Sequence, residues 1–359
     1  MPQQHQFIPL ADARLPLFVG VDLGGTNVKV GVVDDLGRSI SWLSLATEPD
    51  RGPDDGVRRM GHAVLKAIEQ AGAKIGQVAR VGLGSPGTMD IPAGMLLEPP
   101  NLQGWFNYPV RDRLAEACGL PVTFDNDANA AAYGEFWIGS GRDLQSMVMF
   151  TLGTGTGCGI VMDELVLQGQ HSHGAECGHI IIDHHDDAPL CSCGQPGHLE
   201  SYCSAKAVVR RTQAALDAGH ETSMAAKVAA GQPITPLLVA GEAEAGDKVA
   251  LTIVLDTARY LGVGIVNLMH TIDPNGVVIG GAMTFGGHDS PLGRRFLEVV
   301  REEVHRRAFP VLAERTMIDF ARLGGDAGYI GAAGVARLEH NKLQRKQQSP
   351  PFSASTEGG

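Results

Sequence analysis

Residues 17–33 read LFVGVDLGGTNVKVGVV, which is two apolar runs joined by a glycine turn. Runs of this length on both sides of a turn predict two strands that form a hairpin. The pattern recurs in residues 147–162, which read MVMFTLGTGTGCGIVM. There a strand rather than a helix follows the glycines, unlike a dinucleotide-binding fingerprint. The recurrence predicts a duplicated architecture with a nucleotide between the copies; the alternative is two unrelated turns.

Each glycine turn has two interpretations. It can be an ordinary β-turn, for which a pair of glycines is sufficient. It can also bind phosphate, because glycines leave backbone N–H groups open to an anion. In the first turn Thr26 adds a hydroxyl group, and Asp22 is placed to hold Mg²⁺ through water. This turn lacks the Gly-x-x-x-x-Gly-Lys-Ser/Thr spacing, which excludes a Walker-type P-loop.

A second informative stretch, residues 174–200, reads GAECGHIIIDHHDDAPLCSCGQPGHLE. Cys191, Cys193 and His198 follow one another at short spacing, and His179 lies upstream. Thiolates and imidazoles are the ligands that zinc favours, and a structural zinc site needs four of them. The alternative is a loop with two reduced thiols, because the usual Cys-x-x-Cys pairing is absent.

Carboxylates near these stretches are candidates for substrate chemistry. Glu176 and Glu200 flank the cysteine segment, and fixed carboxylates are good acceptors for the hydroxyls of a sugar. Asp125 and Asp127 lie between a predicted short strand and an alanine-rich helix from about residue 128. An aspartate there is either a helix N-cap or a ligand-binding carboxylate at the carboxyl end of a strand. The latter suits a general base for a hydroxyl, and local sequence does not separate the two aspartates.

Composition limits the class of protein. A length of 359 residues suits about two domains, and 43% hydrophobic with 19% charged residues indicates a globular chain. The formal net charge of −11 argues against nucleic acid or an anionic membrane as the main partner. No apolar run predicts a transmembrane helix, and the first residues lack a secretory-signal pattern. Six cysteines are too few for a disulfide scaffold, so we expect a cytoplasmic location.

Periodicity predicts the remaining elements. Apolar residues at helical spacing predict a helix over 56–74, and Gly119 ends another over 109–118. A strand over 277–279 precedes Gly280, Gly281 and Ala282, which either let a flat base approach the backbone or form a simple turn. We also expect a strand over 78–83 and helices over 204–217, 221–230, 235–246, 247–271, about 292–307 and 327–338.

These motifs together resemble the ROK family (repressors, open reading frames, kinases), most closely its bacterial glucokinases, over about residues 17–338. Residues 176–179 are similar to the family's Glu-x-Gly-His motif, and residues 191–200 to its Cys-x-Cys-Gly-x-x-Gly-Cys-x-Glu motif. In that family the motif histidine and three cysteines bind structural zinc. This chain has His198 in place of the third cysteine. Because histidine also ligates zinc, we expect a Cys2His2 site of His179, Cys191, Cys193 and His198.

The resemblance also implies roles for the other candidates. Residues 126–130 resemble the family's catalytic segment, whose aspartate is the base, and this selects Asp127 over Asp125. Asp22–Thr26 and Leu152–Gly159 resemble its two phosphate motifs, and Gly280–Ala282 its adenosine motif. The expected sugar site comprises Gly87, Asn126, Asp127, Glu176, His179 and Glu200. The expected nucleotide site comprises Asp22, Gly24, Gly25, Thr26, Lys29, Gly153, Thr154, Gly155, Gly157, Gly280, Gly281 and Ala282.

The family fold implied by the resemblance is the actin-like (ribonuclease H-like) ATPase pair of α/β domains with a cleft between them. We expect a poorly ordered lead over 1–16 and a small domain over 17–125 that regains the helix over 327–338. A large domain over 126–326 would carry the zinc motif and a dimer surface, and residues 339–359 are predicted to be a disordered tail. A homodimer is expected, as is common in the family.

The resemblance implies an enzyme that transfers the γ-phosphoryl group of ATP to the 6-hydroxyl of glucose, with Mg²⁺ at the phosphates and structural Zn²⁺. A kinase for another hexose, such as mannose, fructose, allose or an N-acetylhexosamine, is the alternative. A sugar-sensing repressor of the same family is disfavoured, because only about 16 residues precede the first strand and such repressors carry a DNA-binding domain there. The acidic net charge also disfavours it.

Overall fold

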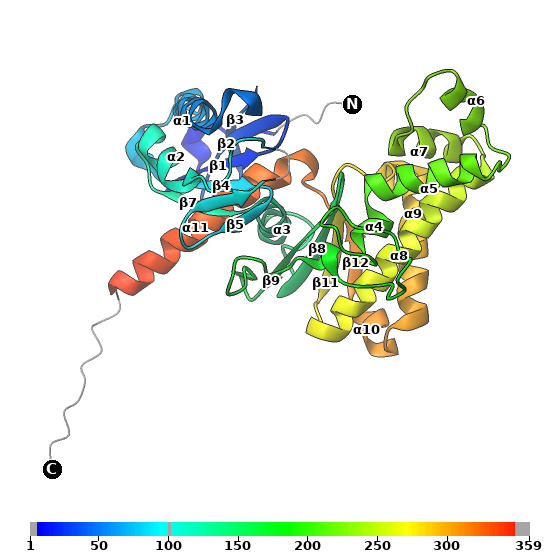
Figure 1. The fold of residues 1–359 in the computed structure, drawn as a ribbon. Helices are drawn as coiled ribbons and strands as arrows, with labels where there is room; N and C mark the ends of the chain where they lie inside the picture. Colours follow the sequence, from blue (N-terminus) through cyan, green and yellow to red (C-terminus); the bar gives the residue numbers. More distant parts are fainter. Residues whose placement is uncertain (1–5, 100–101, 349–359) are drawn as a thin grey trace, which may run out of the picture. The chain divides into compact units, whose positions relative to one another are not determined.

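The computed structural model describes residues 6–99 and 102–348, and the chain divides into two compact units (Figure 1). Unit 1 consists of Met1–Ala130 and Gly328–Gly359, and unit 2 consists of Ala131–Ala327. The border after Ala130 falls inside helix α3 (Asp127–Trp137), slightly later than the expected border at 125. The candidate base therefore belongs to unit 1.

Unit 1 is built on a five-stranded sheet of order β3-β2-β1-β4-β7. Strand β1 pairs antiparallel with β2, as the glycine turn predicts, and β2 pairs antiparallel with β3. The pairs β1–β4 and β4–β7 are parallel. The strands are β1 (Leu17–Leu23), β2 (Asn27–Val33), β3 (Ser39–Ala46), β4 (Val78–Ser85) and β7 (Val122–Asn126), and a separate ribbon consists of β5 (Thr88–Asp90) and β6 (Met95–Glu98).

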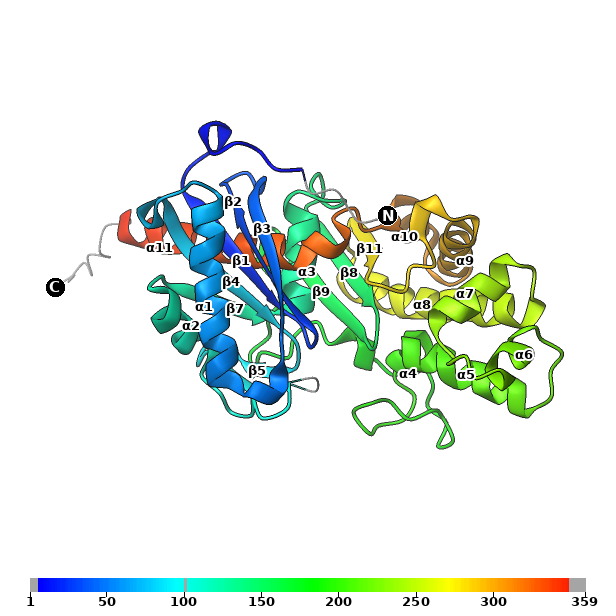
Figure 2. The same cartoon turned by 90° about the horizontal axis from the view of Figure 1, so that it is seen from above.

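Helices cover both faces of this sheet. Helix α1 (Pro53–Gln70) packs on α2 (Val110–Cys118), which ends at Gly119 in the left-handed conformation. Figures 1 and 2 show α1 and α11 (Ala327–Gln348) on opposite faces of the strands. Apolar side chains of the strands and of α1 and α2 form one buried core.

Helix α11 packs against the sheet at a row of three glycines. Gly20 is paired with Gly31 in β2 and with Gly82 in β4, so the three lie side by side across the strands. A Cβ at Gly20 would lie 1.7 Å from the Tyr329 carbonyl oxygen, and one at Gly82 would lie 1.8 Å from that of Ala332. The missing side chains are therefore what allows the helix backbone to approach the strands so closely.

We expect Gly82→Ala to destabilise unit 1 by about 3 kcal/mol, because the added methyl meets helix backbone that a rotamer change cannot move. The change is measured by urea unfolding followed by circular dichroism. Gly76→Ala is the matched control, because a Cβ there meets nothing within 4 Å, and we expect it to be neutral within about 0.5 kcal/mol. A Gly82→Ala variant as stable as the Gly76→Ala variant would contradict this packing.

Unit 2 repeats the sheet topology. Its five strands have the order β10-β9-β8-β11-β12, in which the first three are antiparallel and β8–β11–β12 are parallel. This is the arrangement of unit 1, which confirms the duplicated α/β architecture expected from the two hairpins. The strands are β8 (Ser146–Leu152), β9 (Thr156–Met162), β10 (Leu165–Val166), β11 (Gly276–Gly280) and β12 (Met317–Phe320).

The long helix α8 (Lys248–Ile272) is the centre of unit 2. Among the described residues it alone is long and apolar enough to cross a membrane by length and composition, but 56% of its apolar window is buried within the structure. It packs against α9 and α7 and contributes many side chains to the core, as a core helix of a globular unit does. The other helices are α4 (Glu200–Cys203), α5 (Ala205–Asp217), α6 (Met224–Ala229), α7 (Pro236–Glu244), α9 (Pro291–Arg307) and α10 (Pro310–Arg315).

The structure corrects two expectations at the chain ends. Within the lead, Ile8 donates its amide to Ser39 O at 2.9 Å, and Ile8 and Leu10 pack against the core of unit 1, because these apolar residues have a surface to bury. At the other end α11 continues past Leu338 to Gln348, since the polar residues there are good helix formers. The rest of the expected tail, residues 349–359, and residues 1–5 of the lead lie outside the described residues.

Candidate functional site

The first glycine turn lies between β1 and β2. Gly24 donates its amide to Asn27 O at 3.0 Å. Asp22 stands at the end of β1, and its Oδ2 lies 3.8 Å from Lys29 Nζ in the paired strand. Burial raises the pKa of Asp22, and the ammonium group of Lys29 opposes that rise. The carboxylate is partly exposed, so it remains reachable for a hydrated cation.

The second glycine turn, between β8 and β9, is tied to the cysteine segment. Gly153 donates its amide to Gly155 O at 3.0 Å, which closes the turn. The Thr156 amide donates to Glu200 Oε2 at 3.0 Å. A Cβ at Gly155 would lie 2.4 Å from the same carboxylate oxygen, so glycine leaves the space that Glu200 occupies. Thr154 lies at the tip of the turn, and Gly157 pairs with Thr151 in the sheet.

Asp127 is the first residue of α3 and follows the last residue of β7 directly. Its side chain is half-buried, and its Oδ1 accepts the Ala128 amide at 2.8 Å. The helix cap is formed by its neighbour, since Asn126 Oδ1 accepts the amides of Ala128 and Asn129 at 2.8 and 3.2 Å. The N-cap interpretation of Asp127 is therefore replaced by a cap from Asn126.

Asp125 has a different environment. It is 1% exposed, and its Oδ1 accepts the Asn126 amide at 2.8 Å and Asn129 Nδ2 at 2.9 Å. A carboxylate held in this way inside the protein stabilises the β7–α3 junction. Of the two aspartates, Asp127 is the more exposed.

The four residues expected to bind zinc lie together in unit 2. One ligand atom from each of His179, Cys191, Cys193 and His198 falls within 4.8 Å of the others. The two histidine Nδ1 atoms are 3.3 Å apart. Cys191 Sγ lies 3.6 Å from His179 Nδ1, and Cys193 Sγ lies 3.3 Å from His198 Nδ1.

These spacings fit a zinc ion. Zinc lies about 2.0–2.1 Å from nitrogen and about 2.3 Å from sulfur, so the edges of its ligand tetrahedron are roughly 3.3–3.8 Å. The three measured separations agree with such edges. Burial and the neighbouring His179 lower the pKa of His198, which favours the neutral imidazole that binds a metal. The ring nitrogen of His198 therefore lies within ligand distance of the other three residues.

Glu176 and Glu200 lie beside this cluster. Glu176 Oε2 is 3.8 Å from His179 Nε2, the ring nitrogen on the far side from the cluster. Glu200 Oε1 accepts from the Ser192 hydroxyl and from Cys191 Sγ at 3.3 Å. Burial alone would raise the pKa of Glu200, but the hydrogen bonds from Ser192 and the Thr156 amide outweigh it and leave the pKa below its ordinary value. Glu200 is therefore ionised and links the second glycine turn to the loop that carries Cys191 and Ser192. Sequence spacing did not indicate this contact.

A hollow of about 360 Å³ opens at the carboxyl end of β11 in unit 2. Gly280 and Gly281 line it, and Gly281 has φ +91°, with the position of a Cβ only 2.3 Å from Leu152 O. His288, paired with Asp319 at 2.7 Å and edge-on to the Phe320 ring, forms part of its wall. Most wall residues outside the glycine motif were missed in the sequence, since they come from the loop after that motif, from the end of β12 and from the residues that follow it.

The candidate residues thus form two groups. Unit 1 holds Asp127, Asn126, the first glycine turn and Gly87, which has φ +94° between β4 and β5. Unit 2 holds the second glycine turn, the Cys/His cluster, Glu176, Glu200 and the hollow. The described cysteines are all free thiols.

A family model described as "ROK family" matches residues 18–339. The chain belongs to the ROK family. A glucokinase of Halalkalibacterium halodurans is 32% identical over 92% of this chain and 98% of its own length. Among ROK structures, the glucokinase of Streptomyces griseus in complex with glucose and AMPPNP is 34% identical, with a TM-score of 0.72 over 90% of this chain and 99% of that one.

A second ROK structure, a hexokinase of Thermus thermophilus, is 32% identical with a TM-score of 0.75 over 91% of this chain and 99% of that one. With ROK neighbours of this similarity and the duplicated sheet of its two units, the chain has the actin-like ATPase fold of the family. The fold expected from the sequence is thereby confirmed.

Proposed function

We propose that this ROK protein phosphorylates glucose at the 6-hydroxyl, with ATP as the donor and glucose 6-phosphate and ADP as products. The observation that supports it most is the similarity, over almost the whole chain, to proteins named glucokinase. The glucose and AMPPNP in the Streptomyces griseus relative support the same pair of substrates. AMPPNP is a non-hydrolysable analogue of ATP.

In this proposal Asp127 is the general base. Its carboxylate accepts the proton of the 6-hydroxyl while that oxygen attacks the γ-phosphorus, and the bond from phosphorus to the bridging oxygen of ADP breaks. The half-buried, reachable carboxylate at the end of β7 supports this role. Phosphoryl transfer depends mostly on positioning and charge neutralisation, so the residues that orient both substrates matter as much as the base.

Both hydrogen-bond donors and hydrogen-bond acceptors are available for the hydroxyls of the sugar. Asn126 donates through Nδ2, because its Oδ1 is engaged in capping α3. His179 donates through Nε2 when its Nδ1 is turned to the Cys/His cluster. Glu176 and Glu200 accept, and Gly87 lets the backbone approach the ring, since a residue at this positive φ carries no side chain that would intervene.

Each unit carries groups suited to the nucleotide: the first glycine turn in unit 1, and the second glycine turn and the hollow in unit 2. Backbone amides of Gly25 and Thr154 and the ammonium group of Lys29 face the phosphates, and the hollow beside Gly280–Ala282 takes the adenosine. Its volume of about 360 Å³ lies within the range of small-ligand pockets. Asp22 would hold Mg²⁺, which neutralises phosphate charge.

Three further features belong to the proposal. The Cys/His cluster would hold a structural Zn²⁺, which fixes the loop that carries the sugar-binding carboxylates. A homodimer is supported by exposed apolar side chains in unit 2, Leu165, Ile181 and Leu190. A cytoplasmic location fits free cysteines that include the exposed Cys193.

The second candidate is a kinase for another hexose, because many hexoses share the hydroxyls that these side chains bind. Phosphorylation rates are measured for glucose, mannose, fructose, allose and N-acetylmannosamine with ATP and Mg²⁺. We expect the highest kcat/KM for glucose. A higher value for another hexose would replace the proposed substrate, and ATP consumption without any sugar phosphate would reject the kinase assignment.

A further inference from the structure

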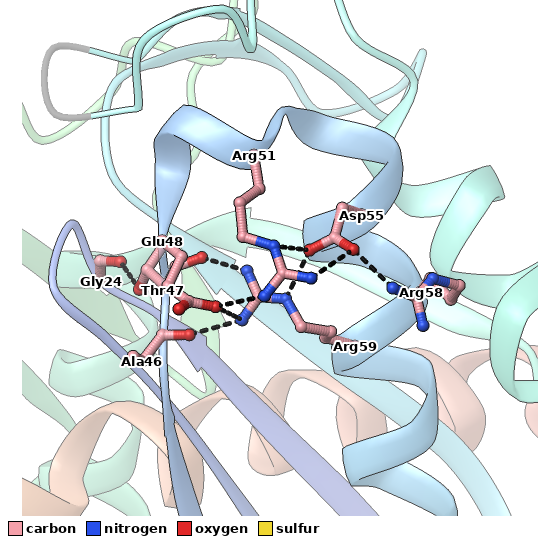
Figure 3. Close-up of polar contacts among 8 residues, drawn as sticks. All are labelled: Gly24, Ala46, Thr47, Glu48, Arg51, Asp55, Arg58 and Arg59. Carbon is pink, nitrogen blue, oxygen red and sulfur yellow. Dashed lines mark hydrogen bonds and ion pairs between the residues drawn. The ribbon is translucent and has the colours of Figure 1, made fainter.

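One residue outside the recognised motifs binds two carbonyl groups of the first glycine turn, those of Gly24 and Thr26. Thr47 follows the last residue of β3 and is 1% exposed. Its Oγ1 donates to Gly24 O at 2.6 Å, and its amide donates to Thr26 O at 2.8 Å. Figure 3 shows the hydroxyl contact with Gly24. The sheet pairing of Asn27 with Ala46 brings the end of β3 beside the turn.

The contact fixes the direction of a peptide plane. In a trans peptide the N–H points opposite to the C=O of the preceding residue. When Gly24 O is turned toward Thr47, the Gly25 N–H must therefore point away from β3. Within residues 6–99 and 102–348, the amides of Gly25 and Thr26 donate no hydrogen bond to the chain. The hydroxyl of Thr47 thus holds the turn with its free N–H group directed outward, as anion binding requires.

Thr47 is itself held by an arginine of α1. Arg59 donates from Nη1 to Ala46 O at 2.6 Å and from Nη2 to Thr47 O, so its guanidinium binds two consecutive carbonyls (Figure 3). Its Nε donates to Asp55 Oδ2 at 2.7 Å, one turn earlier on the same helix. The Arg59 side chain is only 16% exposed, whereas Arg58, the other partner of Asp55 on this helix, is 56% exposed. A planar guanidinium with three such bonds is a rigid support.

We infer that Thr47, supported by Arg59, is a positioning residue for nucleotide phosphate. It keeps the Gly24–Gly25 peptide in the orientation that presents the Gly25 N–H to the phosphates of ATP. This inference rests on the proposed ATP-dependent kinase function. It predicts an effect on nucleotide binding that leaves the affinity for sugar intact. Among the candidate site residues in the described chain, the hydrogen-bond partners of Thr47 all lie in the first glycine turn.

The test compares Thr47→Val with Thr47→Ser in the full chain. Valine keeps the branched shape and removes the hydroxyl, and serine restores the hydroxyl. The dissociation constant of Mg·AMPPNP is measured by calorimetric titration, that of glucose by tryptophan fluorescence, and folding by the thermal midpoint. Loss of one orienting hydrogen bond predicts about tenfold weaker AMPPNP binding for Thr47→Val. Thr47→Ser should stay within about twofold of wild type, with glucose affinity unchanged in both.

Two arginine variants complete the design. Arg59→Met should weaken AMPPNP binding in the same direction, and it carries the test if Thr47→Val does not fold. Arg58→Ala removes only a surface ion pair to Asp55 and should bind AMPPNP as wild type does. Unchanged AMPPNP affinity in folded Thr47→Val or Arg59→Met, or equal loss of glucose affinity, would overturn the positioning role. A wild-type protein that binds no AMPPNP would instead reject the proposed kinase function, and the positioning role with it.

Discussion

Replacing Asp127 by asparagine is expected to lower kcat by a factor of about 10²–10⁴, the usual scale for loss of a general base. Asparagine has the same shape and can still accept the Ala128 amide that Asp127 Oδ1 accepts now, but it cannot take the proton of the sugar hydroxyl. The KM values for glucose and ATP should change little, because binding does not depend on proton transfer. Steady-state kinetics on the folded variant measure the effect.

The matched control for this prediction is Asp125→Asn. Asp125 is buried and accepts from Asn129 Nδ2 and the Asn126 amide, so its loss should lower the thermal midpoint and leave the turnover of the folded protein largely intact. Near-normal turnover in Asp127→Asn, or a collapse of kcat in stable Asp125→Asn alone, would show that the base has been assigned to the wrong aspartate.

Loss of zinc from the Cys/His cluster (His179, Cys191, Cys193 and His198) is the second change with a large expected effect. Protein purified without added metal should contain about one zinc ion per chain by elemental analysis, held by the four clustered residues. Cys191→Ser should lose it. Structural zinc in zinc-finger peptides contributes about 10–16 kcal/mol, so the loop should lose its fixed conformation. Because Glu176, His179 and Glu200 lie on this loop or beside it, glucose affinity should fall by about 100-fold or more.

Two variants separate metal loss from loss of a thiol. His198→Cys restores the cysteine of the family motif that residues 191–200 resemble, and it should keep zinc and activity. Cys118→Ala removes a buried thiol of unit 1 that is not one of the four clustered residues, and it should also keep zinc. If wild-type protein contains no zinc and is fully active, the cluster is not a zinc site.

The two glycine turns were predictable because their signal is local. β-forming residues flank glycines within a single short stretch, and the antiparallel pairing of β1 with β2 and of β8 with β9 follows from it. The Cys/His cluster was predictable for the same reason, since three of its four residues lie within residues 191–198. Strand β12 was not predicted, because Asp319 interrupts its four residues and no glycine motif follows it directly.

The supports of these turns were not predictable, because they are contacts between distant parts of the chain. Thr47 reaches Gly24 from the end of β3, a strand that we did not predict, and Glu200 reaches the Thr156 amide from α4. Nothing in the local sequence of either residue indicates its partner. Glu200 also accepts from Cys191, so the loop that carries Cys191 and the second glycine turn share one carboxylate, a coupling visible only in the folded unit.

The central claim is transfer of the γ-phosphoryl group of ATP to the primary hydroxyl of glucose. Proton-coupled phosphorus NMR of the reaction mixture tests it most directly. We predict a new phosphomonoester signal split into a triplet by the two protons on carbon 6, in equal amount to the ADP formed. A doublet from a phosphate on a ring carbon, or ADP accompanied only by free phosphate, would contradict the claim.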